Sequence, residues 1–389
     1  MKTRLPHALL IAAASLGAFA GFDPTALSAH ETDRPPPHLA ADQPVVQLAL
    51  LLDTSNSMDG LIDQARTRLW QIVKDLSRAR QDGRRARLEV ALYEYGNNGL
   101  SSESGYIRQV LPFTDDLDRI SAELFALDTH GGEEFCGAVI ARAVSHLHWS
   151  HRARDLKLMF IAGNEPFTQG SVDFRDAIRK AVARGIAVNT IFCGPEDEGR
   201  RTGWREGAML ADGTFACINQ DRRMPRIDCP QDREIARLNE ELNRTYLAYG
   251  AHGRARREMQ ATQDMNASAA APSVAAERAV TKSTSLYNNR SWDLVDAVRD
   301  GSVDLEEMKT EDLPEELRDK SAEERKRLVA EAQSARQRTQ QRIQELARER
   351  EAYLAAELAK LPDDGSEALD QAILHSVRAQ AVKVGYSFE

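Results

Sequence analysis

The sequence has no excess of basic residues and, beyond its N-terminus, no long apolar run. Its 389 residues include 51 Lys and Arg against 60 Asp and Glu, which gives a net charge of −9. Because phosphate binding needs a basic surface, this balance argues against nucleic acid as a main partner. A membrane-spanning helix needs about 18 or more consecutive apolar residues. None follows the N-terminal region, so we expect no transmembrane segment in the mature chain.

The N-terminal region has the pattern of an export signal. Lys2 and Arg4 precede the apolar stretch "ALLIAAASLGAFAGF". "ALSA" before His30 offers a small-residue cleavage site, and "AFA" before Gly21 is the alternative. No cysteine lies at that cleavage point, which argues against a lipid anchor. We therefore expect residues 1–29 to be a signal peptide and residues 30–43 to be a Pro-rich linker. The mature protein is then periplasmic or secreted.

Cysteine is scarce, with four in the whole chain. An exported protein matures in an oxidising compartment where disulfides form, and four cysteines allow three pairings. We favour the pairs Cys136–Cys193 and Cys217–Cys229, the second of which closes a short loop. Free, buried thiols are the alternative.

Between residues 44 and 250, apolar strands alternate with amphipathic helices. The pattern predicts strands over residues 45–53, 87–96, 106–113, 156–163, 185–194 and 213–219. The first, "VVQLALLLD", is a continuous apolar run, which is typical of a central parallel strand covered on both faces. Residues 232–250 are expected to close the domain as its last helix. The alternation predicts a doubly wound, mostly parallel α/β sheet with its ligand site at the carboxyl ends of the strands.

A cluster of oxygen-bearing side chains follows the first strand. The stretch "DTSNSMDG" places Asp53, Ser55 and Ser57 at alternate positions there, and carboxylates and hydroxyls suit hard cations. This stretch resembles the metal-ion-dependent adhesion site of the von Willebrand factor A family, and the resemblance covers about residues 44–249. It implies a Rossmann-like α/β fold. It also implies a divalent cation, Mg²⁺ or else Ca²⁺ or Mn²⁺, held by these side chains together with a Thr and an Asp from two further loops.

Those two further loops depart from the family's pattern. Where the family has "GGTNTG" this chain has "THGGEEFCG", so Glu134 stands in place of the Thr. Where the family has "LTDGEP" this chain has "IAGNEP", so Gly163 takes the Asp position and is followed by Asn164 and Glu165. In one interpretation Glu134, or the glutamate before it, and Asn164 or Glu165 rebuild the shell and a cation still binds. In the other, the site is a relic and the strand-end aspartate caps the next helix.

Beyond residue 250 the strand pattern ends and the composition becomes Ala-rich and charged. We expect a helical extension over residues 251–389, with one long helix at about 321–361. The apolar stripe of this helix is narrow and Ala-rich, which favours a coiled-coil-like arm that packs on a partner or on a second copy.

Two shorter segments of the extension carry apolar residues that need burial. Residues 367–382 are expected to fold back on the long helix as a helical hairpin. Tyr287, Trp292 and the apolar residues after them are expected to dock on the sheet domain.

These features predict an exported binding protein and not an enzyme. The resemblance implies cation-assisted recognition of a protein or another cell-envelope component. The alternative is a structural or scaffold protein that acts through its helical arm and has an inactive metal site. A hydrolase that uses Glu134 with the metal is a third interpretation.

Overall fold

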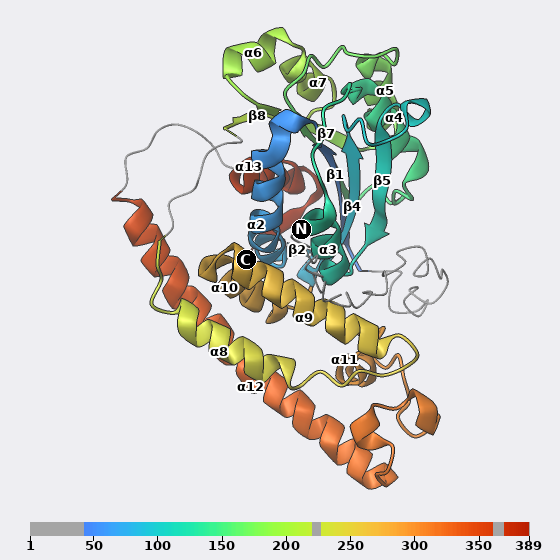
Figure 1. Ribbon diagram of the computed structural model, residues 1–389, viewed down its shortest axis with the longest axis vertical. Helices are drawn as coiled ribbons and strands as arrows, with labels where there is room; N and C mark the ends of the chain where they lie inside the picture. Colours follow the sequence, from blue (N-terminus) through green and yellow to red (C-terminus); the bar gives the residue numbers. More distant parts are fainter. Residues whose placement is uncertain (1–42, 220–226, 361–368, 389) are drawn as a thin grey trace, which may run out of the picture. The chain divides into compact units, whose positions relative to one another are not determined.

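The computed structural model describes residues 43–219, 227–360 and 369–388 (Figure 1). All of these residues belong to one compact unit. The predicted signal peptide and residues 30–42 of the predicted linker lie outside the described residues. Within the described ranges, no helix is both long and apolar enough to cross a membrane.

The N-terminal half of the described chain is built around a six-stranded sheet (Figure 1). Its strands, in order across the sheet, are β5 (Ile107–Thr114), β4 (Arg87–Tyr95), β1 (Val45–Asp53), β6 (Leu156–Gly163), β7 (Ala187–Cys193) and β8 (Phe215–Ile218). All neighbouring strands are parallel except β4 and β5. β1 is buried along its whole length, as its continuous apolar run predicted. The doubly wound, mostly parallel α/β fold is therefore confirmed.

Helices cover both faces of this sheet and bury a separate apolar core on each. The helices of one face are α4 (Cys136–His146), α5 (Phe174–Val182) and α7 (Trp204–Leu210), which follows the short α6 (Glu196–Arg201). The helices of the other face are α2 (Asp59–Leu76), α3 (Leu117–Ala126) and α13 (Leu369–Ala381). Because side chains alternate along a strand, Leu50 of β1 enters the core under α2 and Leu51 enters the core under α4.

The helix that closes the sheet domain comes from the C-terminal end of the chain. α13 packs against α2 and against β6, β7 and β8, and Gln380 Nε2 donates to Asn189 Oδ1 on β7 at 2.7 Å. β9 (Tyr386–Phe388) then pairs with β2 (Ala79–Gln81), which also pairs with β3 (Arg84–Arg85). The predicted hairpin of this segment with the long helix is therefore wrong, because its apolar face covers the sheet.

The predicted last helix of the sheet domain lies elsewhere. α8 (Asp232–Asn243) packs against α10 (Pro272–Lys282) and α12 (Ala322–Leu358), while α9 (Gly253–Ala270) packs against α10 and α3. α8 ends at Asn243, and Ala248, five residues later, forms an isolated β-bridge with Asp293. The prediction for residues 232–250 was wrong because an amphipathic helix does not specify which apolar surface it covers.

The long helix is present, and its buried face differs from the predicted stripe. α12 begins with a capping box in which Ser321 and Glu324 exchange hydrogen bonds. Its most buried positions recur every seven residues and include two arginines: Val329, Arg336, Ile343 and Arg350. The helix therefore packs on helices of its own chain through a mixed apolar and charged face.

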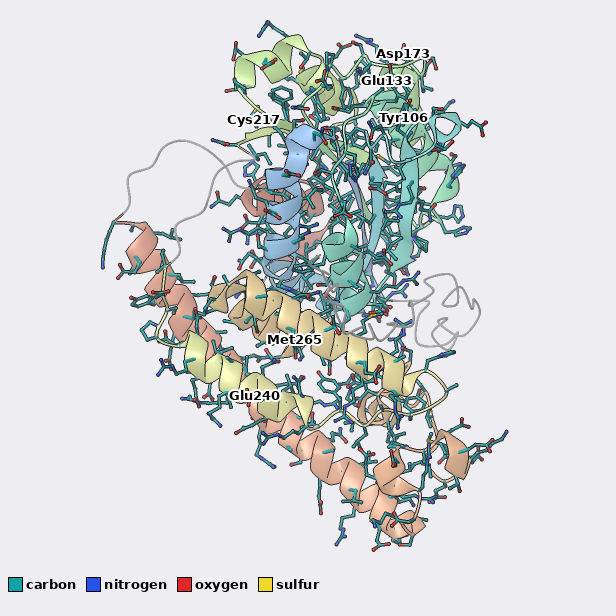
Figure 2. The ribbon with its side chains drawn as sticks, in the orientation of Figure 1. Tyr106, Glu133, Asp173, Cys217, Glu240 and Met265 are labelled. Carbon is teal, nitrogen blue, oxygen red and sulfur yellow. The ribbon has the colours of Figure 1, made fainter. Side chains whose placement is uncertain are left out.

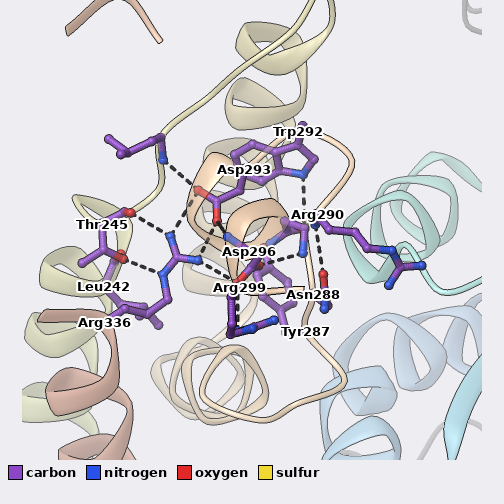
Figure 3. A network of polar contacts seen from close by, with 12 residues as sticks. Leu242, Thr245, Tyr287, Asn288, Arg290, Trp292, Asp293, Asp296, Arg299 and Arg336 are labelled. Atoms are coloured by element: carbon purple, nitrogen blue, oxygen red, sulfur yellow. Dashed lines mark hydrogen bonds and ion pairs between the residues drawn. The ribbon is translucent and has the colours of Figure 1, made fainter. Parts of the chain in front are cut away.

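Arg336 joins α12 to two other segments of the chain (Figure 3). Its guanidinium donates to Asp293 Oδ2 at 2.6 Å and to Asp296 Oδ1 at 2.9 Å, and Asp296 belongs to α11 (Leu294–Arg299). It also donates to the carbonyl oxygen of Thr245 at 2.7 Å and lies 4.2 Å from the centre of the Tyr246 ring. Since an unpaired buried charge is strongly destabilising, these contacts fix α12 against α11 and the segment after α8.

Tyr287 docks on the sheet domain, as predicted, but Leu294, Val295 and Val298 do not: they pack with Leu317 and Val329 in a separate cluster, which corrects that part of the prediction. The Tyr287 hydroxyl donates to Asp118 Oδ2 of α3 at 2.6 Å, and Asp118 also pairs with the buried Arg278 of α10 at 2.8 Å. Arg278 in turn lies 4.6 Å from the centre of the Trp70 ring of α2. The extension and the sheet domain therefore share a buried polar network as well as one apolar core.

Candidate metal centre

Asp53 lies at the carboxyl end of β1, beside the ends of β4 and β6. Its side chain is fully buried. The backbone N–H of Ser55 donates to Asp53 Oδ1 at 2.7 Å, which turns the chain tightly into the short 3₁₀ turn Asn56–Met58 and then α2. The strand thus ends in a carboxylate whose position is fixed by the turn that follows it.

The two predicted hydroxyls and one predicted amide lie in a row next to this carboxylate. The Ser55 and Ser57 hydroxyl oxygens are 3.1 Å apart, and Asn164 Nδ2 donates to Ser57 Oγ at 3.2 Å. Ser55 is buried and Ser57 is exposed, so the row runs from the protein interior to the solvent. The structure therefore brings together residues from two loops that are 107 positions apart in the sequence.

Glu134 is the glutamate that reaches Asp53. Its side chain is 4% exposed, its backbone N–H donates to Gln169 Oε1 at 2.7 Å, and its neighbour Glu133 is exposed. The glutamate and aspartate meet above Gly96, which has φ +80°. A Cβ atom at residue 96 would lie 2.7 Å from Glu134 Cγ and 2.8 Å from Asp53 Oδ1, so the absence of a side chain there makes room for the pair.

The two carboxyl groups strongly affect each other's charge. Burial, opposed in part by hydrogen bonds from Glu134 and Ser55, raises the pKa of Asp53 to about 6. Burial and the nearby charge of Asp53 raise the pKa of Glu134 to about 9. Glu165 is exposed, and its charge raises both pKa values further. Two buried carboxyls this close either share a proton or hold a cation between them.

The residues of the centre fit a divalent cation. Asp53 Oδ2 and Glu134 Oε2 are both buried and have no hydrogen-bond partner, although such atoms normally have one. The described ranges contain no group of three or more His, Cys, Asp and Glu side chains suited to a metal. A cation here would therefore depend on two carboxylates and on the Ser55 and Ser57 hydroxyls, an all-oxygen set that suits Mg²⁺, Ca²⁺ or Mn²⁺.

Gly163 leaves room for the side chain of Tyr95, which the sequence did not identify as part of the site. A Cβ atom at residue 163 would lie 2.5 Å from the Tyr95 hydroxyl and 3.0 Å from Asp53 Oδ2. The Tyr95 hydroxyl donates to the Ala162 carbonyl at 3.0 Å and so occupies the space of the side chain that the family's pattern expects. Tyr95 ends a buried strand, and nothing in its local pattern distinguishes it from a core residue.

The predicted disulfides Cys136–Cys193 and Cys217–Cys229 are not formed, which corrects that prediction. No disulfide joins any of the four cysteines, all of which lie in the described ranges. Cys136 and Cys193 belong to the cores on opposite faces of the sheet, so the sheet separates their sulfur atoms. Burial raises the pKa of both thiols well above the usual range, and Cys229 Sγ lies 3.0 Å from Gln231 Oε1.

Residues 47–202 match the family profile of the von Willebrand factor type A domain. No curated protein shows a significant match to the chain. Solved structures with local similarity include proximal thread matrix protein 1 from the mussel byssus, at 10% identity and a TM-score of 0.32. That alignment covers 46% of this chain and 42% of the mussel protein, so the chain spans less than half of the mussel protein's length.

Bacterial proteins are among the other similar structures. An aerotolerance-related membrane protein from Bacteroides fragilis aligns at 15% identity and a TM-score of 0.31, covering 45% of this chain and 93% of that one. The pilus adhesin SpaC from Lactobacillus rhamnosus GG aligns at 13% identity and a TM-score of 0.34, covering 46% and 28%. A second structure of the mussel protein carries zinc in its metal-ion-dependent adhesion site.

Proposed function

Because residues 47–202 are a von Willebrand factor type A domain, we propose that the protein binds a divalent cation at Asp53, Ser55, Ser57 and Glu134 and uses this centre to recognise a partner. Domains of this family serve as modules for protein interaction and adhesion. The observation that carries the proposal is the pair of buried carboxylate oxygens without hydrogen-bond partners, Asp53 Oδ2 and Glu134 Oε2. A cation between them would remove the cost of burying two like charges.

The chemistry of the centre indicates what the partner offers. Two ionised carboxylates neutralise a divalent ion, and the exposed Glu165 adds further negative charge. A carboxylate from a partner would therefore gain less here than at a centre with fewer acids. We propose that the partner is a protein or another cell-envelope component that offers a neutral oxygen, such as a hydroxyl or carbonyl group, to the cation.

Export of the protein is part of the proposal. The basic start, apolar stretch and small-residue cleavage site of residues 1–29 support a periplasmic or secreted location. N-terminal sequencing of the protein purified from its host tests this location, because export predicts a mature chain that begins at His30. A mature chain that retains Met1 would contradict it.

Thermal unfolding tests the cation site. The full chain should unfold at a higher temperature in Mg²⁺, Ca²⁺ or Mn²⁺ than in chelator, because an ion that binds only the folded state at about 100 times its Kd adds about 2.7 kcal/mol. Asp53→Asn should abolish this shift. The matched control is Asp173→Asn, because Asp173 caps α5 through its side-chain oxygen and asparagine caps equally well.

Two alternatives give different results in the same experiment. If none of the three ions shifts the unfolding temperature, the centre is inactive, and the scaffold function of the helical extension becomes the better proposal. The hydrolase interpretation is supported by the raised pKa of Glu134, which keeps that carboxyl protonated near neutral pH, as a general acid requires. Turnover of an ester, peptide or glycan substrate that is lost in Glu134→Gln would establish it.

A further inference from the structure

The tip of the helical extension carries most of the net negative charge of the protein. Residues 300–324 contain eleven acidic and three basic side chains, a net charge of −8, against −9 for the whole chain. Nine of the eleven acidic residues are exposed. The segment contains only 3₁₀ turns and loops before α12 begins. Its carboxylates therefore form an acidic surface around the junction of α11 and α12.

A groove lined by both apolar and polar side chains lies within this acidic tip. Its volume is about 600 Å³, and it runs between the loop after α11 and the first turns of α12. Val303 and Leu305 line it from the loop, and Val329 lines it from the helix. Val303 and Leu305 are only partly buried, although they pack against a small apolar cluster that includes Leu294 and Leu317. The groove is thus an extension of a core that the chain does not cover completely.

The charged residues of the groove are acidic or already paired. Asp304 and Glu306 stand at its border, and Lys326, the only lysine or arginine among the residues that line it, forms an ion pair with Glu306. The charge that remains unpaired beside the apolar residues of the groove is therefore negative. An anionic lipid surface or an acidic protein would be repelled by residues 300–324, whereas a basic segment would be attracted.

We propose that this groove binds a cationic amphipathic segment of a partner protein. The apolar side chains of such a segment would fill the space over Val303, Leu305 and Val329, and its Lys or Arg residues would face the surrounding carboxylates. Grooves that offer apolar side chains are recurring receptors for the apolar face of an amphipathic helix, and the carboxylates around this groove would attract the cationic residues of such a helix. The site is independent of the cation centre.

The test measures binding of a defined probe to the full chain by fluorescence anisotropy. The probe is a labelled amphipathic helical peptide of Leu and Lys, and its counterpart has Glu in place of each Lys. The Lys peptide should bind, with an affinity that falls as salt is added, and the Glu peptide should not. Ala330 is exposed and lines the groove, so Ala330→Trp should fill it and weaken binding by about tenfold or more, equivalent to about 1.4 kcal/mol.

Matched variants separate this groove from general attraction to an acidic protein. Ala356→Trp places the same side chain on an exposed position of α12 outside the groove, and it should leave the affinity unchanged. Asp304→Asn should weaken binding while keeping the oxygen that accepts from the Glu306 N–H. Glu240→Gln removes an exposed charge on α8, outside residues 300–324 (Figure 2). This variant should bind the Lys peptide as tightly as the wild type.

Three outcomes would overturn the proposal. The first is equal weakening by Ala330→Trp and Ala356→Trp, and the second is equal binding of the Lys and Glu peptides. The third is self-association of the chain that Ala330→Trp abolishes, because the occupant would then be a second copy. Asp53→Asn changes the cation centre but leaves the groove intact. Binding of the Lys peptide by this variant would show that the groove acts independently of the cation centre.

Discussion

Replacing Glu134 by glutamine tests the charge state of the candidate metal centre. In the metal-free protein, burial and the neighbouring Asp53 raise the pKa of Glu134 to about 9 from an ordinary value of 4.5. The folded protein therefore holds a proton near neutral pH that the unfolded chain has released. Glutamine keeps the shape and hydrogen-bonding capacity of the protonated acid but cannot lose a proton.

The magnitude follows from the linkage between proton binding and stability. When the folded state holds one more proton than the unfolded state, the free energy of unfolding falls by about 1.4 kcal/mol for each pH unit. For Glu134, whose folded pKa is raised, the stabilisation is complete below pH 4.5 and is lost as the pH rises toward about 9. Between pH 6 and pH 8 the metal-free protein should therefore lose about 2.7 kcal/mol from this group.

The assay is thermal unfolding of the wild type and Glu134→Gln in chelator at pH 6, 7 and 8. A loss of this size should lower the unfolding temperature of the wild type by on the order of 5 °C between pH 6 and pH 8. Glu134→Gln should not show this part of the pH dependence. Saturating Mg²⁺ should remove the dependence in the wild type, because a bound cation replaces the proton between Asp53 and Glu134.

Two results would refute this reasoning. Equal pH dependence of the wild type and Glu134→Gln would mean that Glu134 is ionised in the folded, metal-free state. A variant that is still stabilised by Mg²⁺ to the same extent would mean that Glu134 does not take part in cation binding. Glu133→Gln is the control, since Glu133 is exposed and should leave both the pH dependence and the Mg²⁺ effect unchanged.

Three further predictions concern the packing around these sites. Arg336→Met should destabilise the protein by about 3–5 kcal/mol in urea unfolding, because it leaves the buried Asp293 without its cation; an effect below 1 kcal/mol would contradict the importance of that pair. Gly163→Asp, which introduces the family's residue, should destabilise by about 1–3 kcal/mol through a clash with the Tyr95 hydroxyl, and the added change Tyr95→Phe should recover part of the loss. Thiol titration of the unfolded protein without reductant should find all four cysteines reactive, whereas a count of two or none would show that disulfides form.

The sequence alone determined the features that depend on neighbouring residues. Apolar patterns located the six strands of the central sheet, and the run that ends at Asp53 identified its central strand. They did not predict β2, β3 or β9, which are only two or three residues long. The alternate spacing of Asp53, Ser55 and Ser57 placed their oxygens near one another because a tight turn follows the strand. The helical period likewise located α12 to within a few residues of its ends.

Tertiary structure decided everything that depends on contacts between distant segments. Amphipathic helices fit any apolar surface, so the pattern of residues 369–381 does not reveal that α13, rather than α8, closes the sheet. The burial of Arg336 in α12 depends on aspartates about 40 positions away, and a charged residue in a helix otherwise suggests a solvent-facing position. The motif spacing placed Glu134 at the Thr position, but its meeting with Asp53 depends on a loop that lies against Gly96. Only the fold shows that Glu134 is buried there while Glu133 faces the solvent.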